Sequence, residues 1–506
     1  MGNDVIFTNI KQSESKYTNA SGGVNGYETN WLKMDWNWGN IISALRWNHV
    51  ISNKLFMNAT CSYTHYGFDL AVGNENQTVR YSPAKETFKN TTLTYNSGIE
   101  DVSTKMDFDY SLNASNDIKF GTNYTFHRFN PGITVAEMES NTSGSSDTVI
   151  GDQNIVSHEA IAYIEDNIRI SGAIKANIGV RYSSFLVQNH FYNSVQPRLG
   201  IRYLLNEKLS LKAGYASMSQ YIHLLSNNNV SLPTDLWVPV TKRIEPMKSH
   251  QVTFGTFYNL NNFIELSVET YYKSMDNLIE YKDGASFFGS STGWEDKVSV
   301  GRGWAYGIEF LAQKSVGKTT GWVGYTWAKS ERKFDRPGEV LNNGKAFPTK
   351  YDRRHDLSIV VAHKFSEKID VSATWVYSSG SAGTLSLQNY LATDIPGTNP
   401  TSTVPSDATT VDVTNSIPYI SSRNNYRYEP YHRLDVGVNF NKKLKHGTRT
   451  WNISIYNVYN QLNPFLVTVK SNSTYNESTH VYTKKNTLIQ TSIFPIIPSV
   501  SYCYKF

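Results

Sequence analysis

The sequence predicts an all-β protein, a transmembrane antiparallel up-and-down β-barrel, and three observations support this class. Apolar and polar residues alternate with a period of two along many segments. Aromatic residues form 13% of the chain, with 33 Tyr and 11 Trp, whereas charged residues form only 18%. Short turns alternate with long polar connections. Together these features are typical of a sheet that faces lipid on one side and water on the other.

Hydropathy indicates how such a chain crosses a membrane. The mean hydropathy is −0.43, and the sequence has no run of about 18 apolar residues, which excludes a helical span. A closed barrel satisfies its backbone groups through strand pairing, and its alternating pattern keeps the average hydropathy low. The net charge of +5 is dispersed along the 506 residues without a basic stripe, so no nucleic-acid partner is expected.

The alternation is clear on both sides of the turn that begins at Asn113. Met106, Phe108 and Tyr110 share one face of the preceding segment, whereas Asp107 takes the other face with its polar neighbours. We count about 17 such strands of about 10 to 18 residues, which is long enough to cross a membrane at a tilt. A soluble β-sandwich also alternates, so the connections must decide between the two architectures.

The connections favour the barrel. Short turns follow the odd strands and long connections follow the even ones, as expected for tight periplasmic turns and long outer loops. The predicted tight turns lie near Asn53, Asn113, Ser171, Asn206, Asn261, Gly317, Ser366 and Gly447. The predicted outer connections are residues 130–154, 223–244, 282–300, 331–349, 380–426 and 460–482.

The alternation of short and long connections also gives the direction in which each strand crosses the membrane. The first clear strand, Trp38–Val50, and the last, Leu488–Phe506, both descend toward the periplasm, which makes the strand number odd. Because single-chain bacterial barrels have even numbers, at least one strand is expected to be missing before Trp38. We therefore interpret residues 1–36 as the remnant of an outer loop or a disordered tail, and residues 37–506 as the barrel.

The chain ends on an aromatic face. Phe506, Tyr504, Tyr502 and Val500 lie on one side of the last strand. A terminal aromatic residue after alternating aromatics resembles the signal by which the barrel-assembly machinery recognises outer-membrane barrels, although an ordinary terminal strand can also end in Phe. Cysteine gives no disulfide framework or zinc spacing, because the two residues, Cys61 and Cys503, lie far apart within strand patterns.

Three segments carry a resemblance to a known family. Tyr351, Asp352, Arg353, Arg354 and His355 enter a late strand, and the segments Arg433–Phe440 and Trp451–Tyr459 follow. In order and spacing, and with the terminal Phe506, these segments resemble TonB-dependent receptors of Bacteroidota. The charged residues of the first segment either anchor the strand mouth and the outer loops as a charge network, which we favour, or contact a ligand.

The resemblance implies a barrel of about 22 strands with a plugged lumen. Because about 17 strands are present, we expect a carboxy-terminal portion of such a receptor, without signal peptide and plug. The implied function is TonB-dependent uptake, in the cell outer membrane, of a nutrient such as a siderophore, haem, glycan or peptide. The implied partners are outer-membrane lipid, the barrel-assembly machinery, the nutrient, a plug domain and, through the plug, TonB. No cofactor is implied.

Two other functions remain open at this point, a plug-less passive porin or adhesin barrel and a soluble all-β binding protein. Ligand contacts are predicted from aromatic residues of the long connections, although barrels also use such residues as anchors at the membrane interfaces. These candidates are Trp237, Phe287, Phe288, Trp294, Tyr390 and Tyr419.

Catalysis is not expected. The nearest inward pair of histidines in one strand, His355 and His363, would lie roughly 27 Å apart, so one metal ion could not bridge them. The sequence has no nucleophile elbow, and the Gly380–Gly383 segment is typical of a flexible loop. We therefore predict neither an enzyme nor a metal site.

Overall fold

The computed structural model describes residues 2–18, 24–81, 83–141, 144–151, 154–226, 235–261, 263–283, 285, 293–386, 388–391, 416–476 and 481–506. Within these ranges the chain is all-β, with two short 3-10 helices, η1 (Trp294–Lys297) and η2 (Asn342–Gly344). No helix in the described part of the chain is long and apolar enough to span a membrane.

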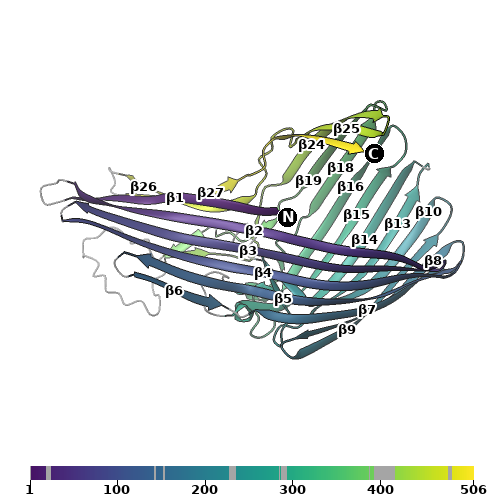
Figure 1. Cartoon of the computed structure of the whole chain (residues 1–506), viewed down its shortest axis with the longest axis horizontal. Coiled ribbons are helices and arrows are strands. Elements are labelled where there is room, and N and C mark those ends of the chain that lie inside the picture. Colours follow the sequence, from purple (N-terminus) through teal and green to yellow (C-terminus); the bar gives the residue numbers. More distant parts are fainter. Residues whose placement is uncertain are drawn as a thin grey trace.

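One sheet of 20 strands forms the body of the molecule (Figure 1). Its strands are β1 (Gly2–Thr18), β2 (Val24–Ser52), β3 (Leu55–Tyr81), β4 (Ala84–Asn113), β5 (Asn116–Ser140), β6 (Gly144–Gly151), β7 (Ile155–Arg169), β8 (Ile174–Val187), β9 (His190–Leu204), β10 (Leu209–Gln220), β13 (Met247–Asn259), β14 (Ile264–Tyr281), β15 (Val298–Lys314), β16 (Thr319–Lys333), β17 (Phe347–Pro348), β18 (His355–Lys364), β19 (Ile369–Ser378), β24 (Tyr431–Leu444), β25 (Gly447–Tyr456) and β28 (Ile497–Lys505).

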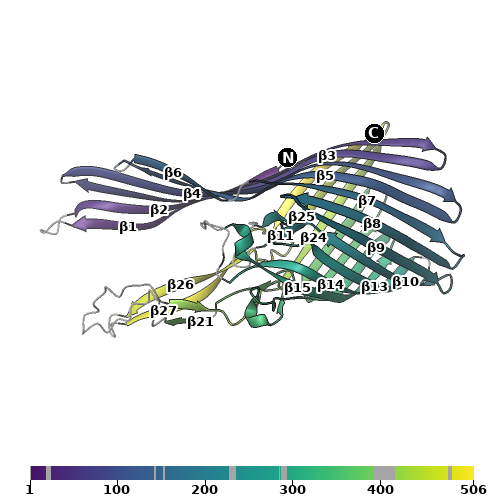
Figure 2. The same cartoon turned by 90° about the horizontal axis from the view of Figure 1, so that it is seen from below.

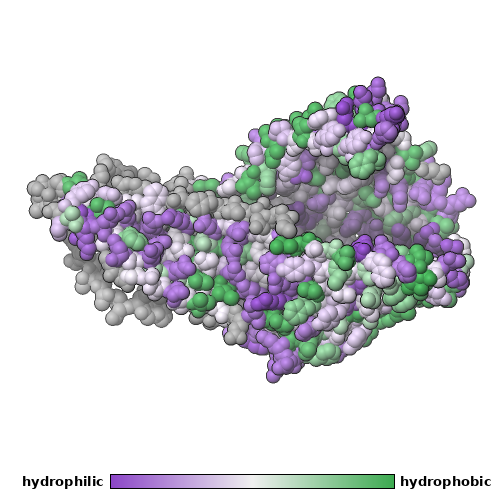
Figure 3. Space-filling model, viewed as in Figure 1, coloured by the Kyte–Doolittle hydropathy of each residue, from purple (hydrophilic) through white to green (hydrophobic). Residues whose placement is uncertain are grey.

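The outer connections carry shorter strands of their own. These pair as β11 (Ile222–Leu225) with β12 (Leu236–Pro239), β20 (Ala382–Gly383) with β23 (Tyr426–Arg427), β21 (Gln388–Leu391) with β22 (Ser416–Tyr419), and β26 (Leu466–Asn476) with β27 (Val481–Thr491). Apart from short β6 and β17, the strands of the large sheet run antiparallel in chain order, which confirms the up-and-down topology. In the pairings between described residues, β1 pairs with β2 and β28 with β25, and they are the edge strands. Figure 3 shows the lumen between these edges.

The eight predicted tight turns are confirmed, and all lie at one end of the sheet. Several of these turns are stabilised in the same way. The first polar side chain of the turn accepts hydrogen bonds from the backbone N–H groups two and three residues later. The Asn113 Oδ1 accepts from the backbone N–H of Ser115 at 2.8 Å, and the Asn206 Oδ1 accepts from that of Leu209 at 2.9 Å. Ser366 Oγ accepts similarly at 3.2 Å. These turns are therefore encoded locally, which explains why the sequence revealed them.

The first strands are longer than the sequence predicted. β2 has 29 residues, β3 has 27 and β4 has 30, whereas about 9 to 11 residues suffice for a tilted crossing. Their outer parts extend far past the body, together with β1 and β6 (Figure 2). Residues expected to form a loop remnant or a disordered tail instead form β1 and the first part of β2, because each pairs along its length with a neighbour.

The last strand is shorter than predicted. The segment Leu488–Thr491 belongs to the outer hairpin β26–β27, and β28 begins only at Ile497. Pro495 lies between the two strands, where its missing backbone N–H interrupts strand pairing. Pro498 is accepted inside β28, opposite Ile455. The segment that contains Pro495 and Pro498 therefore separates the β26–β27 hairpin from the last strand of the large sheet.

The two faces of the sheet differ as the alternation predicts. On β8, Ile178, Val180 and Tyr182 are exposed outward, whereas Ser183 is fully buried toward the lumen beside Gln196 of β9. Figure 3 shows apolar side chains over the outward face of the front strands and more polar ones over their long extensions. The exposed apolar side chains are therefore explained by lipid contact.

Candidate functional site: the lumen wall and its outer mouth

Amide and carboxylate side chains form a ladder on the lumen face of β19, β24 and β25. Asp370 accepts from Asn439 Nδ2 at 2.7 Å and from Asn441 Nδ2 at 2.6 Å. The Asn439 Oδ1 in turn accepts from Asn452 Nδ2 at 2.7 Å, and the Asn441 Oδ1 accepts from Thr450 Oγ1 at 2.7 Å. Because these groups satisfy one another along the wall, the lumen presents a hydrophilic and ordered surface.

The opposite part of the wall holds a buried charge network. His127 is 3% exposed and its Nδ1 lies 2.7 Å from Asp101 Oδ1. Its Nε2 lies 3.5 Å from Glu159 Oε2, and Arg181 approaches the other Glu159 oxygen at 3.8 Å. Charges in such a wall are paired because an isolated buried charge is costly.

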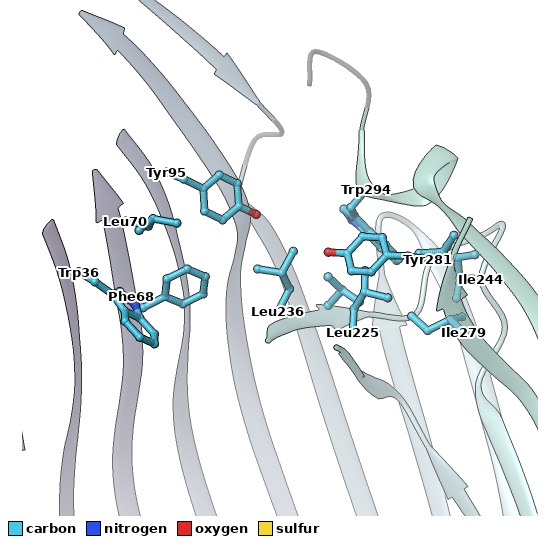
Figure 4. Close-up of a cluster of buried hydrophobic side chains, with 12 residues drawn as sticks. Trp36, Phe68, Leu70, Tyr95, Leu225, Leu236, Ile244, Ile279, Tyr281 and Trp294 are labelled. Carbon is cyan, nitrogen blue, oxygen red and sulfur yellow. The ribbon is translucent and has the colours of Figure 1, made fainter. Parts of the chain in front are cut away.

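An apolar cluster bridges the lumen at the outer mouth (Figure 4). One side comes from the lumen faces of β2, β3 and β4, and the other from the β11–β12 hairpin, β14, β15 and η1. The buried members are Trp36, Phe68, Leu70, Tyr95, Leu225, Leu236, Val238, Ile244, Ile279, Tyr281, Trp294 and Val298. Two walls that are distant in sequence are therefore joined by an outer connection that folds inward.

The β11–β12 hairpin carries a buried histidine, His223, which lies opposite Val238. Burial lowers the pKa of His223 to about 4, and the positive charge of Arg332 acts in the same direction, against a hydrogen bond with the Glu245 backbone. Within the described part of the chain, its Nε2 has no hydrogen-bond partner. The docked hairpin thus holds this imidazole in the neutral form.

Asp352 is the centre of the charged segment that the sequence singled out. It is 2% exposed, and its Oδ1 accepts from the Ser330 backbone N–H at 2.7 Å. The Arg427 guanidinium pairs with Oδ2 and also donates to the Asp352 carbonyl oxygen at 2.6 Å. The Arg354 Nε lies 3.4 Å from Oδ2. This carboxylate therefore joins β16, the start of β18 and the outer connection that precedes β24.

The neighbours of Asp352 reach different elements. The Tyr351 hydroxyl lies 2.9 Å from Ser226 Oγ, beside the β11–β12 hairpin. Arg353 donates to Ser378 Oγ at 3.3 Å, and the His355 ring contacts the Tyr325 hydroxyl at 2.8 Å. The segment is thus spread over several strand ends, an arrangement that suits structural anchoring, and Arg353 alone of its five residues also lines a hollow at the outer mouth.

A second anchor, Arg423, was not singled out from the sequence. It is 9% exposed, donates to Asp283 Oδ1 at 2.8 Å and lies 3.8 Å from Glu280. Arg332 also pairs with Glu280, at 2.6 Å. Since Arg423 lies in a polar loop and its partners are about 140 residues away, no local pattern marked it. The pairing ties the β19–β24 connection to the outer end of β14.

A hollow of about 160 Å³ opens at the outer ends of β18, β19 and β24. Lys350 and Arg353 bring positive charge to it, and Tyr428 and Tyr431 bring phenol groups. Its remaining lining residues are Ser379, Gly380, Ser381, Ala382, Gly383, Glu429, Pro464, Phe465 and Val467. Cations beside aromatic rings at a lumen mouth suit a ligand that carries negative charge and flat apolar surface.

The predicted ligand-contact aromatics do not converge. Trp294 is buried at 4% exposure in the bridging cluster, and Trp237 is half-buried in β12. Tyr419 is exposed at the end of β22, and Tyr390 lies in β21. The predictions for residues 287–288 lie outside the described residues. Trp294 is thus a packing residue, and the others stay separate candidates.

The terminal aromatic face lies outward, as its alternation indicates. Val500 and Tyr502 are exposed, and Tyr502 packs edge-on against Trp451 with ring centroids 4.9 Å apart. Tyr504 donates to the His446 carbonyl oxygen at 2.9 Å, and Phe506 is fully exposed. The structure therefore leaves the terminal aromatic side chains accessible from outside the barrel.

The fold described above has an antiparallel barrel wall with an apolar outward face, a polar lumen and outer connections that fold inward. These features are typical of the outer-membrane β-barrels. A family model described as "TonB dependent receptor-like, beta-barrel" matches residues 3–460. The chain belongs to this family, whose members are outer-membrane receptors and transporters, and it is accordingly an outer-membrane protein.

Solved structures of such receptors resemble the chain. For the ferric-catecholate import receptor Fiu from K12 E. coli, the identity is 11% and the TM-score 0.48, covering 99% of this chain and 78% of that one. For the ferripyoverdine receptor of Pseudomonas aeruginosa, the identity is 11% and the TM-score 0.49, covering 92% and 67%. For the siderophore receptor PirA from Acinetobacter baumannii, the values are 11% and 0.48, covering 91% and 76%. A search of curated protein sequences found no match.

Proposed function

We propose that the chain is the barrel of a receptor that takes up a nutrient, such as a siderophore, haem, glycan or peptide, by the TonB-dependent route. Membership of the TonB-dependent receptor family carries the proposal. The hydrophilic ladder around Asp370 and Asn439 supports it, because a polar wall suits both a plug domain and a passing polar solute. Because the family consists of receptors and transporters, we propose no enzymatic activity.

Ligand capture is proposed at the outer mouth, in the hollow beside Lys350 and Arg353. These two side chains line the hollow together with Tyr428 and Tyr431, at the outer strand ends. An anionic chelate or haem would place its charge against the cations and its flat groups against the rings. The Asp352 network adjoins this hollow, because Arg427 also donates to the carbonyl oxygen of the lining residue Gly380 at 3.2 Å, so that binding would be transmitted to the strand ends that the network joins.

Uptake by cells that depend on this receptor tests the proposal. Cells would be supplied with single defined nutrients, and accumulation of each labelled nutrient would be followed with and without TonB. We expect one nutrient to accumulate only when both the receptor and TonB are present. Equal accumulation without TonB would instead show a passive pore.

A matched pair of variants tests the place of capture. Arg353→Gln is expected to raise the nutrient concentration that gives half-maximal uptake by roughly tenfold, since one charge-assisted contact is lost. Arg336→Gln, an exposed arginine of the neighbouring connection outside the hollow, is the control and should leave uptake unchanged. Equal effects of the two changes would place capture elsewhere.

A further inference from the structure

Three rows of residues cross the outward face of β2–β5 in register. The innermost row is apolar and contains Tyr63, which lies opposite Val102, and both are exposed. The next row along the strands, toward their outer ends, is charged, and in it Glu100 lies between His65 and Arg128. Two residues along a strand span about 7 Å. The change from apolar to charged side chains therefore marks the level at which the hydrocarbon core of the membrane gives way to the lipid headgroups.

The third row consists of glycines. Gly67 lies opposite Gly39 on one side and Gly98 on the other. A Cβ at Gly98 would come within 2.6 Å of the Tyr66 carbonyl oxygen, so this close approach of the strands requires glycine. Because three neighbouring positions lack side chains, the outward face is indented there, and a hollow of about 420 Å³ results.

Polar side chains surround this glycine hollow and are linked to one another. Asn96 donates to Asp69, and Asn130 donates to the Asn96 Oδ1 at 2.8 Å. Glu100 accepts from the Tyr63 hydroxyl at 3.1 Å. The lining residues are Asn37, Trp38, Gly39, Ile41, His65, Gly67, Phe68, Asp69, Asn96, Ser97, Gly98, Ile99, Glu100, Arg128, Asn130 and Asn154.

Two lining atoms lack a hydrogen-bond partner among the described residues, the Asn37 Oδ1 and the His65 Nδ1, and the second of them lies 3.7 Å from Glu100. The Asn37 Oδ1 is buried, and no donor among the described residues reaches it. A buried acceptor without a hydrogen bond costs free energy unless a ligand or solvent satisfies it. The glycine hollow thus offers an acceptor for a ligand hydroxyl or amide.

The charges of the glycine hollow indicate the ligand class. Asp69 and Glu100 oppose Arg128 and His65, and Arg128 lies 3.7 Å from Glu100. Without an excess of positive charge, a free phosphate or another small anion gains little there. Linked amides and carboxylates above a flat floor of glycine backbone suit the hydroxyl groups and the ring face of a sugar.

We propose that the glycine hollow binds the sugar headgroup of a glycolipid of the outer leaflet. The acyl chains of the lipid run toward the middle of the membrane along the apolar row of Tyr63 and Val102, which is next to the charged row along the strands. A soluble sugar would leave this continuous apolar surface unused, which is why the membrane is the favoured source. The site faces away from the lumen and so is separate from the proposed capture site of the nutrient.

The test uses the full chain in nanodiscs of phosphatidylethanolamine that contain rough lipopolysaccharide as the glycolipid probe. After extraction into mild detergent, native mass spectrometry counts the lipopolysaccharide molecules retained on each chain. We expect retention by the unaltered chain. Gly67→Val fills the hollow, and Asn37→Leu removes the unpartnered acceptor, so each should lower the retained fraction roughly tenfold.

Gly67→Val is compatible with folding, since its Cβ would approach the end of the His65 ring at 3.2 Å and would meet the Ser97 carbonyl oxygen only at an ordinary contact distance of 3.7 Å. The matched control is Asn193→Leu, an exposed residue of β9 outside the glycine hollow, which should retain lipopolysaccharide normally. A heat-modifiable electrophoretic band confirms that each variant forms the barrel.

Three outcomes would overturn the proposal. They are equal retention by the unaltered chain and the two hollow variants, equal loss in the control variant, and displacement of lipopolysaccharide by free glucosamine disaccharide at matched concentration. The last would show that the hollow takes soluble sugars. None of these outcomes bears on TonB-dependent uptake.

Discussion

Leu236 offers a direct test of the bridge across the lumen mouth. Its side chain is 2% exposed and lies opposite Leu225 in the β11–β12 hairpin, facing Trp36 and Phe68 of the other wall (Figure 4). Replacing a buried leucine by alanine removes apolar contacts and leaves a cavity, which costs about 2 to 5 kcal/mol. With about 3 kcal/mol lost, the undocked population of the hairpin should rise about a hundredfold.

Amide hydrogen exchange measures this population, because the hairpin amides exchange when the hairpin opens. Leu236→Ala should therefore speed exchange of the β11–β12 amides about a hundredfold while leaving the amides of β18 and β19 unchanged. Leu224→Ala is the matched control, since Leu224 belongs to the same hairpin but is 37% exposed. A surface change of about 0.5 kcal/mol corresponds to only about a twofold increase. Equal acceleration by both changes would refute the apolar bridge.

Three further predictions concern other parts of the molecule. Because His223 has a pKa of about 4 when docked and about 6.5 in the open chain, only the open hairpin binds a proton between these values. Lowering the pH from 7 to 5 should accordingly raise hairpin opening, corrected for intrinsic exchange, by roughly twentyfold. A His223→Leu variant should show a flat profile, and an unchanged slope in that variant would exclude this histidine. Asp352→Ala removes the carboxylate that accepts from Arg427 and from the Ser330 backbone N–H. Because the Arg427 side chain is 35% exposed and is not left as a buried charge, the expected cost is about 1 to 3 kcal/mol. The change should expose the outer connections to protease, whereas Arg336→Ala should not; equal cleavage would contradict the anchoring role. Phe506→Ala should lower the amount of heat-modifiable barrel in the membrane, and an unchanged amount would count against an assembly signal.

Much of the fold was predictable because its determinants are local. A strand shows its two faces by alternation, and turns such as those at Asn113 and Asn206 are made by one side chain and the next few backbone groups. Strand ends were less predictable. β2 begins at Val24 rather than near Trp38, since pairing with β1 and β3, and not its own composition, extends it.

The candidate site was predictable only in part. The segment around Asp352 was recognised because its charges are consecutive, but Arg427 and Arg423, which complete the anchors, lie in loops whose composition is uniform. Trp294 shows the reverse case. It looked like a ligand contact, but it is buried because η1 packs it into the apolar cluster beside Tyr281 (Figure 4).

The sequence by itself determined the all-β barrel class, its tight turns, the outward terminal aromatics and the membership of a receptor family, since each depends on residues close together or on a pattern repeated along the chain. Only the tertiary structure decided which outer connection crosses the lumen and which charges meet. It also aligned Gly39, Gly67 and Gly98 into one hollow. These features depend on strand register and loop packing, in which small free energies from many distant residues add up.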